Sequence, residues 1–165
     1  MIVTLTLNPS VDRTVSVDGL TVGEVHRATS SRVDPGGKGI NVTRALTANG
    51  TESIAVYPTG GPEGALMKRL LDAAGIARAA VSVVGSIRMN ITIVDPHGVT
   101  TKVNEPGPRL SPAEVEAVRA TTAEHLGRGG AQWLVISGSL PPGVDPAVYG
   151  DLVRLGHAAG ARVAI

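Results

Sequence analysis

The sequence predicts an α/β fold in which helices flank a parallel β-sheet. Short apolar, β-branched segments alternate along the 165 residues with longer amphipathic segments. This alternation is typical of strand–helix–strand units with right-handed crossovers. Aromatic residues make up only 2% of the chain and Phe is absent, so the core must be built from Val, Leu, Ile and Ala. Such a core suits parallel strands that are buried on both faces.

The first part of the chain combines one buried strand with two more polar ones. Residues 2–7 are apolar and β-branched and stop at Asn8 and Pro9, which predicts a buried strand. Residues 14–17 and 25–33 are β-prone but polar, and glycine turns lie between them. These two segments predict antiparallel strands with one solvated face.

Helices are predicted from their end signals and from apolar stripes. Gly50 follows the first helix as a left-handed C-cap. Ser111, with Pro next and Glu114 third after it, is a capping-box signature. The expected helices span residues 38–48, 62–74 and 111 to about 126, and a fourth begins at 145. The remaining strands are expected at residues 53–58, 81–84, 90–94, 99–103, 133–136 and 162–165.

Composition excludes several classes of function. The net charge of +1 and the scarcity of aromatic residues argue against nucleic-acid binding. Without cysteine there is no disulfide, thiol catalysis or thiolate metal site, and the four histidines lack metal-ligand spacing. No apolar run reaches the roughly 18–20 residues of a membrane span, and the first residues lack a secretory pattern. We therefore expect a cytoplasmic protein that does not contact a membrane.

The strongest local signal is a glycine-rich turn at residues 35–42 (Pro-Gly-Gly-Lys-Gly-Ile-Asn-Val). Glycines let the backbone approach a ligand closely, and the N–H groups of the following helix favour anionic or oxygen-rich groups. Such turns also occur for packing reasons alone. The spacing is not that of a nucleoside-triphosphate P-loop, which would need a glycine in place of Arg32 and a hydroxyl in place of Gly39.

Three further segments accompany this turn: residues 5–13 (Leu-Thr-Leu-Asn-Pro-Ser-Val-Asp-Arg), 88–92 (Arg-Met-Asn-Ile-Thr) and 135–143 (Val-Ile-Ser-Gly-Ser-Leu-Pro-Pro-Gly). Together the four resemble the phosphosugar branch of the ribokinase-like (PfkB) carbohydrate kinases, over the whole chain. Within that branch the likeness is greatest to the 1-phosphofructokinases, followed by the tagatose-6-phosphate kinases. The resemblance implies a ribokinase-like fold with a small projecting β-sheet, the lid, from strands at about 13–33 and 88–104.

The resemblance also implies a reaction. Such kinases transfer the γ-phosphoryl group of ATP, with Mg²⁺, to a ketohexose phosphate, here most closely fructose 1-phosphate. Members of the family continue past the position of Ile165 for roughly as long again, with a Gly-Ala-Gly-Asp motif that carries the catalytic base and with most of the nucleotide site. We therefore expect residues 1–165 to be the N-terminal part of one such domain, truncated at its C-terminal half, which binds the acceptor and is inactive alone.

Four of the expected acceptor ligands lie near the first strand and the glycine-rich turn. Asp12 follows the end of the first strand, where ligands bind in open α/β sheets, and a carboxylate there can accept hydroxyl hydrogen bonds. The alternative for Asp12 is a turn residue that caps its own backbone. The resemblance assigns Asp12 and Asn41 to sugar hydroxyls, and Gly36 and Gly37 to backbone contacts with the same sugar.

A second group carries positive charge. The resemblance places Lys38 and Arg88 at the substrate phosphate, and the planar fork of Arg suits bidentate phosphate recognition. A solvated lysine and an exposed arginine at a strand end are the alternatives. Asn90 belongs to the same segment, and Lys102 on the returning strand could add a second charge.

A third group follows the strand at residues 133–136. Here the resemblance implies that Ser137, Gly138 and Ser139 contact the substrate. They do not form a hydrolase nucleophile elbow, which would need a glycine in place of Pro141. No general base emerges from the residues of this chain.

The resemblance also predicts how the protein assembles, and two alternatives to the predicted function stay open. Related kinases bury the lid against a partner's copy, so we expect a homodimer through that sheet. Tagatose-6-phosphate or fructose-6-phosphate kinase is the alternative within the family. The alternative from another class is a non-catalytic module that binds a sugar phosphate or dimerises.

Overall fold

The main sheet of the protein is parallel throughout. The computed structural model describes residues 1–128 and 130–165. Five strands form this sheet in the order β5-β4-β1-β8-β9, and each neighbouring pair runs parallel. Its strands are β1 (Ile2–Leu5), β4 (Ser53–Thr59), β5 (Arg78–Ser82), β8 (Trp133–Ile136) and β9 (Arg162–Ala164).

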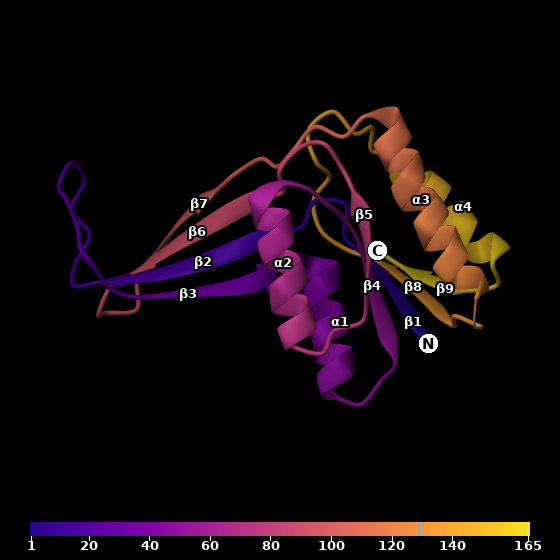
Figure 1. Ribbon diagram of the computed structural model, residues 1–165, viewed down its shortest axis with the longest axis horizontal. Coiled ribbons are helices and arrows are strands. Elements are labelled where there is room, and N and C mark those ends of the chain that lie inside the picture. The colour runs from indigo at the N-terminus through magenta and orange to yellow at the C-terminus, as the bar shows by residue number, and fades with distance from the viewer. Residues whose placement is uncertain (129) are drawn as a thin grey trace.

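A second sheet forms the predicted lid. Its strands are β2 (Ser10–Val17), β3 (Ala28–Gly36), β6 (Arg88–Val94) and β7 (Thr100–Asn104), in the order β3-β2-β6-β7. The outer pairs β2–β3 and β6–β7 are antiparallel, while β2 and β6 run parallel. Figure 1 shows this sheet extending away from the rest of the molecule.

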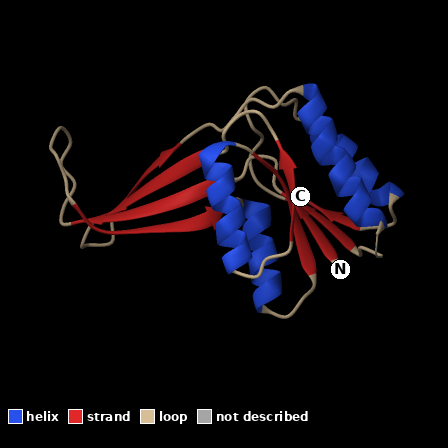
Figure 2. Ribbon diagram, in the orientation of Figure 1, coloured by secondary structure: helices blue, strands red, loops and turns tan. Residues whose placement is uncertain are grey.

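Four helices cover the two faces of the main sheet in pairs. They are α1 (Lys38–Ala48), α2 (Gly61–Ala73), α3 (Pro112–Gly127) and α4 (Ala147–Ala158). The first two lie on one face and the last two on the other (Figure 2). The predicted α/β class with a projecting small sheet is therefore confirmed. No helix among the described residues has the length and apolarity that a membrane span requires.

Each face of the main sheet has its own apolar core. Under α3 and α4 the core includes Val3, Leu5 and Leu134, and under α1 and α2 it includes Tyr57 and Met67. Strand β1 supplies fully buried side chains to the sheet centre, as the continuous apolar run predicted. The lid differs, because every residue of β7 is exposed.

The end signals of the helices are confirmed in detail. α1 occupies the predicted residues, and Gly50 after it takes φ +71°. At the start of α3 the Ser111 hydroxyl accepts from the Glu114 N–H, and the Glu114 carboxylate accepts from the Ser111 N–H. This is the capping box that the sequence predicted.

Several strand boundaries were predicted wrongly. Strand β1 ends at Leu5 rather than at residue 7, and β3 spans Ala28–Gly36 rather than 25–33. Strand β5 spans Arg78–Ser82 rather than 81–84, because pairing with β4 starts at Ala55 opposite Arg78. Its Arg-Ala-Ala start has low strand propensity, which the neighbouring strand overrides. Strand β2 begins at Ser10 rather than at residue 14. Asp12 therefore lies inside a strand and not in a turn.

Candidate functional site

The predicted site residues surround the junction of the two sheets. β1 ends at Leu5, and after a short buried link the chain enters β2 at Ser10. β3 in turn ends at Gly36 and leads into α1 through Gly37. The carboxyl end of β1, the base of the lid and the start of α1 thus meet in one place. This is the edge of an open α/β sheet at which ligands bind.

Asp12 is held on the lid by two donors. Its Oδ1 accepts from the Ser10 hydroxyl at 2.7 Å and from the Asn90 amide Nδ2 at 2.9 Å. Asn90 lies directly opposite Asp12 across the parallel β2–β6 pair. The central strands of the lid therefore fix the carboxylate.

Gly36 leaves the space that this carboxylate occupies. A Cβ atom at Gly36 would lie 2.3 Å from Asp12 Oδ2, well inside the distance that real side chains tolerate. Any larger residue would displace the carboxylate. The glycine that the resemblance assigned to a backbone contact is also a steric requirement of Asp12.

The start of α1 is organised around Thr6. Gly37 precedes the helix at φ +114°, a conformation that side-chain-bearing residues rarely adopt. Gly37 offers no capping side chain, and the Thr6 hydroxyl instead accepts from the Ile40 N–H at 3.1 Å. A Cβ at Gly138, which has φ +122°, would lie 4.0 Å from the backbone N of Lys38. The turn after β8 thus lies against the helix N-terminus, and the Lys38 side chain is exposed.

A polar cavity of about 440 Å³, here called the lid pocket, joins four predicted residues from four elements. Asp12 comes from β2, Asn41 from α1, Asn90 from β6 and Lys102 from β7. The other lining residues are Thr14, Arg32, Asp34, Pro35, Arg44, Thr92 and Asn104. Polar and charged side chains dominate this lining, as a carbohydrate site requires.

The sequence analysis did not single out the cations Arg32 and Arg44 of this pocket. Arg44 Nη1 donates to Asn41 Oδ1 and to the Pro35 carbonyl, each at 3.3 Å. Arg32 pairs with Asp34 at 2.7 Å. Arg44 lies one helical turn after Asn41, so helical periodicity on the glycine-rich turn could have indicated it.

Arg88 lies outside the lid pocket. It lines a neighbouring cavity of about 390 Å³ together with Glu63, Glu105 and Arg109, among others. Its guanidinium donates to the Asn8 carbonyl at 3.3 Å and to the Glu105 carbonyl at 3.2 Å. In the same cavity, the Ser86 hydroxyl that binds Glu63 lowers the pKa of that carboxyl. The structure thus separates the predicted phosphate anchor from the predicted sugar ligands.

Asn8 was treated in the sequence only as the end of a strand, yet it connects the loops of the site. The side chain is 3% exposed. Its Nδ2 donates to the Pro106 carbonyl at 3.0 Å and to the Leu140 carbonyl at 3.3 Å, and it lies 3.4 Å from the Ser139 hydroxyl. Ser139 is thereby placed beside the end of β1. The Ser137 N–H donates to the Leu5 carbonyl at 3.0 Å, and Gly138 O accepts from the Tyr149 hydroxyl at the same distance.

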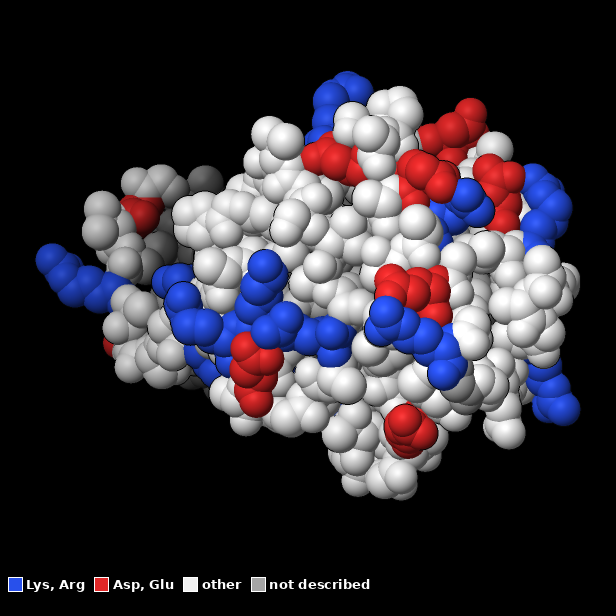
Figure 3. All heavy atoms as spheres, turned by 45° about the vertical axis from the view of Figure 1, so that its right-hand side comes forward, with Lys and Arg blue, Asp and Glu red and all other residues white. Residues whose placement is uncertain are grey.

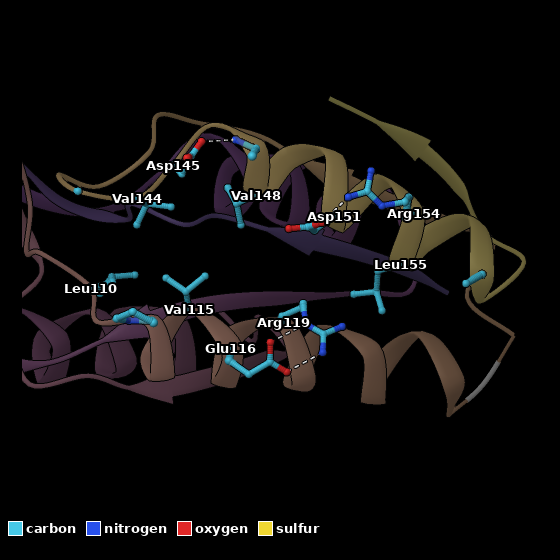
Figure 4. A pocket seen from close by; sticks show the side chains of 14 residues that line it. Leu110, Val115, Glu116, Arg119, Val144, Asp145, Val148, Asp151, Arg154 and Leu155 are labelled. Atoms are coloured by element: carbon cyan, nitrogen blue, oxygen red, sulfur yellow. Dashed lines mark hydrogen bonds and ion pairs between the residues drawn. The ribbon is translucent and has the colours of Figure 1, made fainter.

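A larger cavity lies elsewhere and contains none of the predicted residues. This interhelix groove, of about 780 Å³, runs between α3 and α4 (Figure 4). Val115, Val148 and Leu155 give it an apolar lining. Four of its charged residues are paired within their own helices, Glu116 with Arg119 and Asp151 with Arg154, and Asp145 accepts from the Ala147 N–H. The Arg119 hydrogen bond holds the pKa of Glu116 below its usual value. Paired charges and an apolar lining offer no group poised for phosphosugar chemistry.

The distribution of charged side chains bears on metal binding among the described residues and on the character of one face of the molecule (Figure 3). Among the residues that the structure describes, no three His, Cys, Asp or Glu side chains are grouped so as to hold a metal ion. On the face shown in Figure 3, Lys and Arg side chains form a row with Asp and Glu beside them.

Comparison with known proteins identifies the family. The pfkB family carbohydrate kinase model matches residues 5–165. The chain belongs to this family. It is 39% identical over 165 residues to a 1-phosphofructokinase of Rhodobacter capsulatus, covering 99% of this chain and 52% of that protein. A tagatose-6-phosphate kinase of Staphylococcus epidermidis is 34% identical over 97% of this chain and 51% of its own length.

A solved structure shows the same arrangement. Phosphofructokinase-2 from Escherichia coli in complex with fructose-6-phosphate superposes with a TM-score of 0.90 at 32% identity, over 98% of this chain and 53% of that one. The predicted ribokinase-like fold is thus confirmed. The chain spans about half the length of the curated relatives it matches.

Proposed function

We propose that residues 1–165 are the acceptor-binding, N-terminal part of an ATP-dependent phosphosugar kinase, with fructose 1-phosphate as the acceptor. The observation that carries this proposal is the lid pocket, which brings Asp12, Asn41, Asn90 and Lys102 together from four separate segments. Carboxylate and amide groups suit sugar hydroxyls, and a lysine suits a phosphate. Membership of the carbohydrate kinase family supports the same role.

The phosphate has two candidate locations. Lys38 and Arg88 are the anchors that the sequence resemblance implies, whereas Lys102 and Arg44 are the cations that line the lid pocket. Arg88 can bind the phosphate only in place of its hydrogen bonds to the Asn8 and Glu105 carbonyls or in addition to them. We assign the phosphate to Arg88 and Lys38, the anchors that the resemblance implies, and not to the lid pocket that Lys102 lines.

Binding measurements on the purified chain test this assignment. Arg88→Ala should weaken fructose 1-phosphate by about 1.5–3 kcal/mol, the usual value of a charged hydrogen bond, and unphosphorylated fructose far less. Asp12→Ala should weaken both sugars by similar factors, because its hydroxyl partners are common to both. Asp18→Ala and Arg69→Ala, at exposed positions, are the matched controls. The phosphate would instead be assigned to the lid pocket if Arg88→Ala lowered the affinity for both sugars equally and Lys102→Ala lowered only the affinity for fructose 1-phosphate.

The sugar phosphate is assigned by likeness alone. The relatives are named for fructose 1-phosphate and tagatose 6-phosphate chemistry, and the solved neighbour holds fructose-6-phosphate. Tagatose 6-phosphate and fructose 6-phosphate are therefore the alternative acceptors. Titrating the three sugar phosphates against the chain by calorimetry ranks them directly, and tighter binding of a 6-phosphate would overturn our choice.

ATP and Mg²⁺ belong to the proposed function of the longer protein. The resemblance places the catalytic base beyond residue 165, and such a base contributes about 10²–10⁴-fold to proton transfer. We therefore expect no phosphorylation of fructose 1-phosphate by residues 1–165 with ATP and Mg²⁺. Turnover above a buffer blank, in material free of host kinases, would contradict the proposal.

The rival proposal is a non-catalytic module that binds a sugar phosphate or dimerises. A homodimer through the lid is common to both proposals. It is supported by the exposure of every residue of β7, including the apolar Val103, which is 55% exposed. Light scattering of a monomer at high micromolar concentration would remove the dimer. Binding of a sugar phosphate without turnover, in a protein shown by intact mass and gene sequence to end at Ile165, would favour the module.

A further inference from the structure

The hydrogen bond between Asn90 and Asp12 fixes which way the Asn90 amide faces. A carboxylate can only accept, so the amide group that approaches Asp12 Oδ1 to 2.9 Å must be the NH₂. The Asn90 carbonyl oxygen therefore points away from Asp12. This oxygen is buried, and no donor reaches it within residues 1–128 and 130–165. A buried acceptor without a partner costs free energy unless a ligand supplies the donor.

Asp12 is left with one oxygen for a ligand. Both of its donors, the Ser10 hydroxyl and the Asn90 amide, go to Oδ1. Ser10 is only 1% exposed, so its hydroxyl is directed by the fold rather than by solvent. Oδ2 lies in the space that Gly36 leaves open. Facing residues of β2 and β6 therefore each keep one acceptor to which no described residue donates, Asp12 Oδ2 and Asn90 Oδ1.

The other side chains of the lid pocket have the opposite polarity. Arg44 donates to Asn41 Oδ1, so the NH₂ group of Asn41 is the part left for a ligand. Lys102 and the remaining N–H groups of Arg44 are donors as well. The two residues that carry these acceptors, on β2 and β6, thus line the same cavity as donors from α1 and β7.

We infer that Asn90 determines acceptor specificity: its carbonyl oxygen and Asp12 Oδ2 each accept from one of two neighbouring hydroxyls. The pocket then selects a polyol with a vicinal diol. The two hydroxyls of that diol donate to two different residues rather than both to Asp12. Ser10 is a positioning residue, which acts by holding Asp12 Oδ1. This inference rests on the proposed sugar-phosphate function and adds the polarity of the site to it.

The role of Asn90 is tested by a thermodynamic cycle that compares the natural chain and an Asn90 variant, each with the natural ligand and with deoxy analogues. The probes are fructose 1-phosphate and its 3-deoxy and 4-deoxy analogues, titrated against the purified chain by calorimetry. We expect Asn90→Ala to weaken fructose 1-phosphate about ten-fold. It should weaken the one analogue that lacks the hydroxyl bound by Asn90 clearly less, because only the hydrogen bond from Asn90 to Asp12 Oδ1 is then lost. Thr92→Val, two residues along the same strand in the same pocket, is the matched control and should affect all three sugars alike.

A second cycle tests Ser10. Ser10→Ala should weaken fructose 1-phosphate several-fold in the natural chain and not at all in an Asp12→Ala background, because Ser10 acts only through that carboxylate. A role in stability alone predicts the same loss in both backgrounds and would overturn the assignment. Thermal melts of each variant show whether it is folded. If Asn90→Ala is not folded, Asn90→Ser replaces it, because serine keeps a donor toward Asp12 but lacks the carbonyl oxygen of asparagine.

The outcomes separate this inference from the function on which it rests. Binding of the sugars with equal losses for all three in the Asn90 variants overturns the inference and leaves the proposed function standing. Failure of the folded natural chain to bind any sugar phosphate overturns both.

Discussion

The two sheets of this protein use similar β-prone residues in opposite ways. In the main sheet Val3 and Leu5 of β1 are fully buried between helices on both faces, whereas every residue of the lid strand β7 is exposed. The main sheet gains its stability from apolar burial. The lid extends from the body, and side chains such as Asn90 and Lys102 line a cavity instead of a core.

The difference shows where a ligand can be accommodated. A close-packed core leaves no room for a polar ligand, while an open sheet alone cannot hold side chains in place. The lid pocket lies where the two meet, and β2 enters it from the buried Ser10. Asp12 is therefore held by two lid strands, one of which begins at a buried residue at the junction.

The largest expected effect contrasts the two sheets directly. Leu5→Ala removes a fully buried side chain from the core and should lower the free energy of unfolding by about 2–5 kcal/mol. Val103→Ala in the lid, where the residue is 55% exposed, should change it by less than about 0.5 kcal/mol. Urea denaturation of both variants measures the contrast. A comparable loss at Val103 would show that a partner covers the lid in solution.

The junction of the two sheets should be sensitive to a single methyl group added at Gly36. Gly36→Ala places a Cβ 2.3 Å from Asp12 Oδ2, and we expect a loss of about 1–3 kcal/mol in stability from overpacking, together with weaker sugar-phosphate binding. Gly19→Ala is the control, since no heavy atom lies within 4 Å of the added methyl group. Urea denaturation and calorimetric titration measure the two effects. Unchanged binding in Gly36→Ala would separate Asp12 from the site.

The helices that cover the main sheet should be sensitive at their caps. Ser111→Ala removes one half of the capping box of α3 and should cost about 1 kcal/mol. Thr121→Ala, at a half-buried position of the same helix, removes a hydroxyl that is not a cap and should be neutral or slightly stabilising. Thermal melts compare the two. Equal destabilisation would mean that the cap contributes nothing specific.

The smallest effect concerns a polar atom inside the core. Burial raises the pKa of Tyr57 to about 12, with the nearby Arg78 charge acting in the opposite direction. Within the described residues the buried hydroxyl has no hydrogen-bond partner. Tyr57→Phe should therefore leave stability at pH 7 unchanged or raise it by up to about 1 kcal/mol.

The pH dependence of the same variant follows from the sign of the shift. The pKa of an unfolded Tyr is near 10, so the natural chain should lose stability as the pH rises from about 10 toward 12, where the folded hydroxyl ionises. The Phe variant should lack that loss. Urea midpoints between pH 9 and 11.5 measure it, and parallel curves for the two proteins would show that the hydroxyl is not buried in solution.

Local signals in the sequence predicted much of the fold. The residues of α1 and β8 were predicted at their observed limits, because a glycine C-cap ends α1 and a short apolar run makes up β8. Asp12, Asn41, Asn90 and Lys102 were predicted from motif order, and the structure brings all four into one pocket. Their assignment as sugar ligands stays a prediction.

Only the tertiary structure decided how the parts meet. Strand β5 follows the register of β4 rather than its own propensity, and β2 pairs in parallel with β6, far along the chain. That pairing places Asn90 opposite Asp12 and fixes the direction of its amide, while Arg88, two residues earlier, lies in a separate cavity. The sequence by itself determined which polar residues lie near the site, since caps and apolar runs act over a few neighbouring residues. The polarity of the pocket depends on hydrogen bonds between distant strands, which no local pattern encodes.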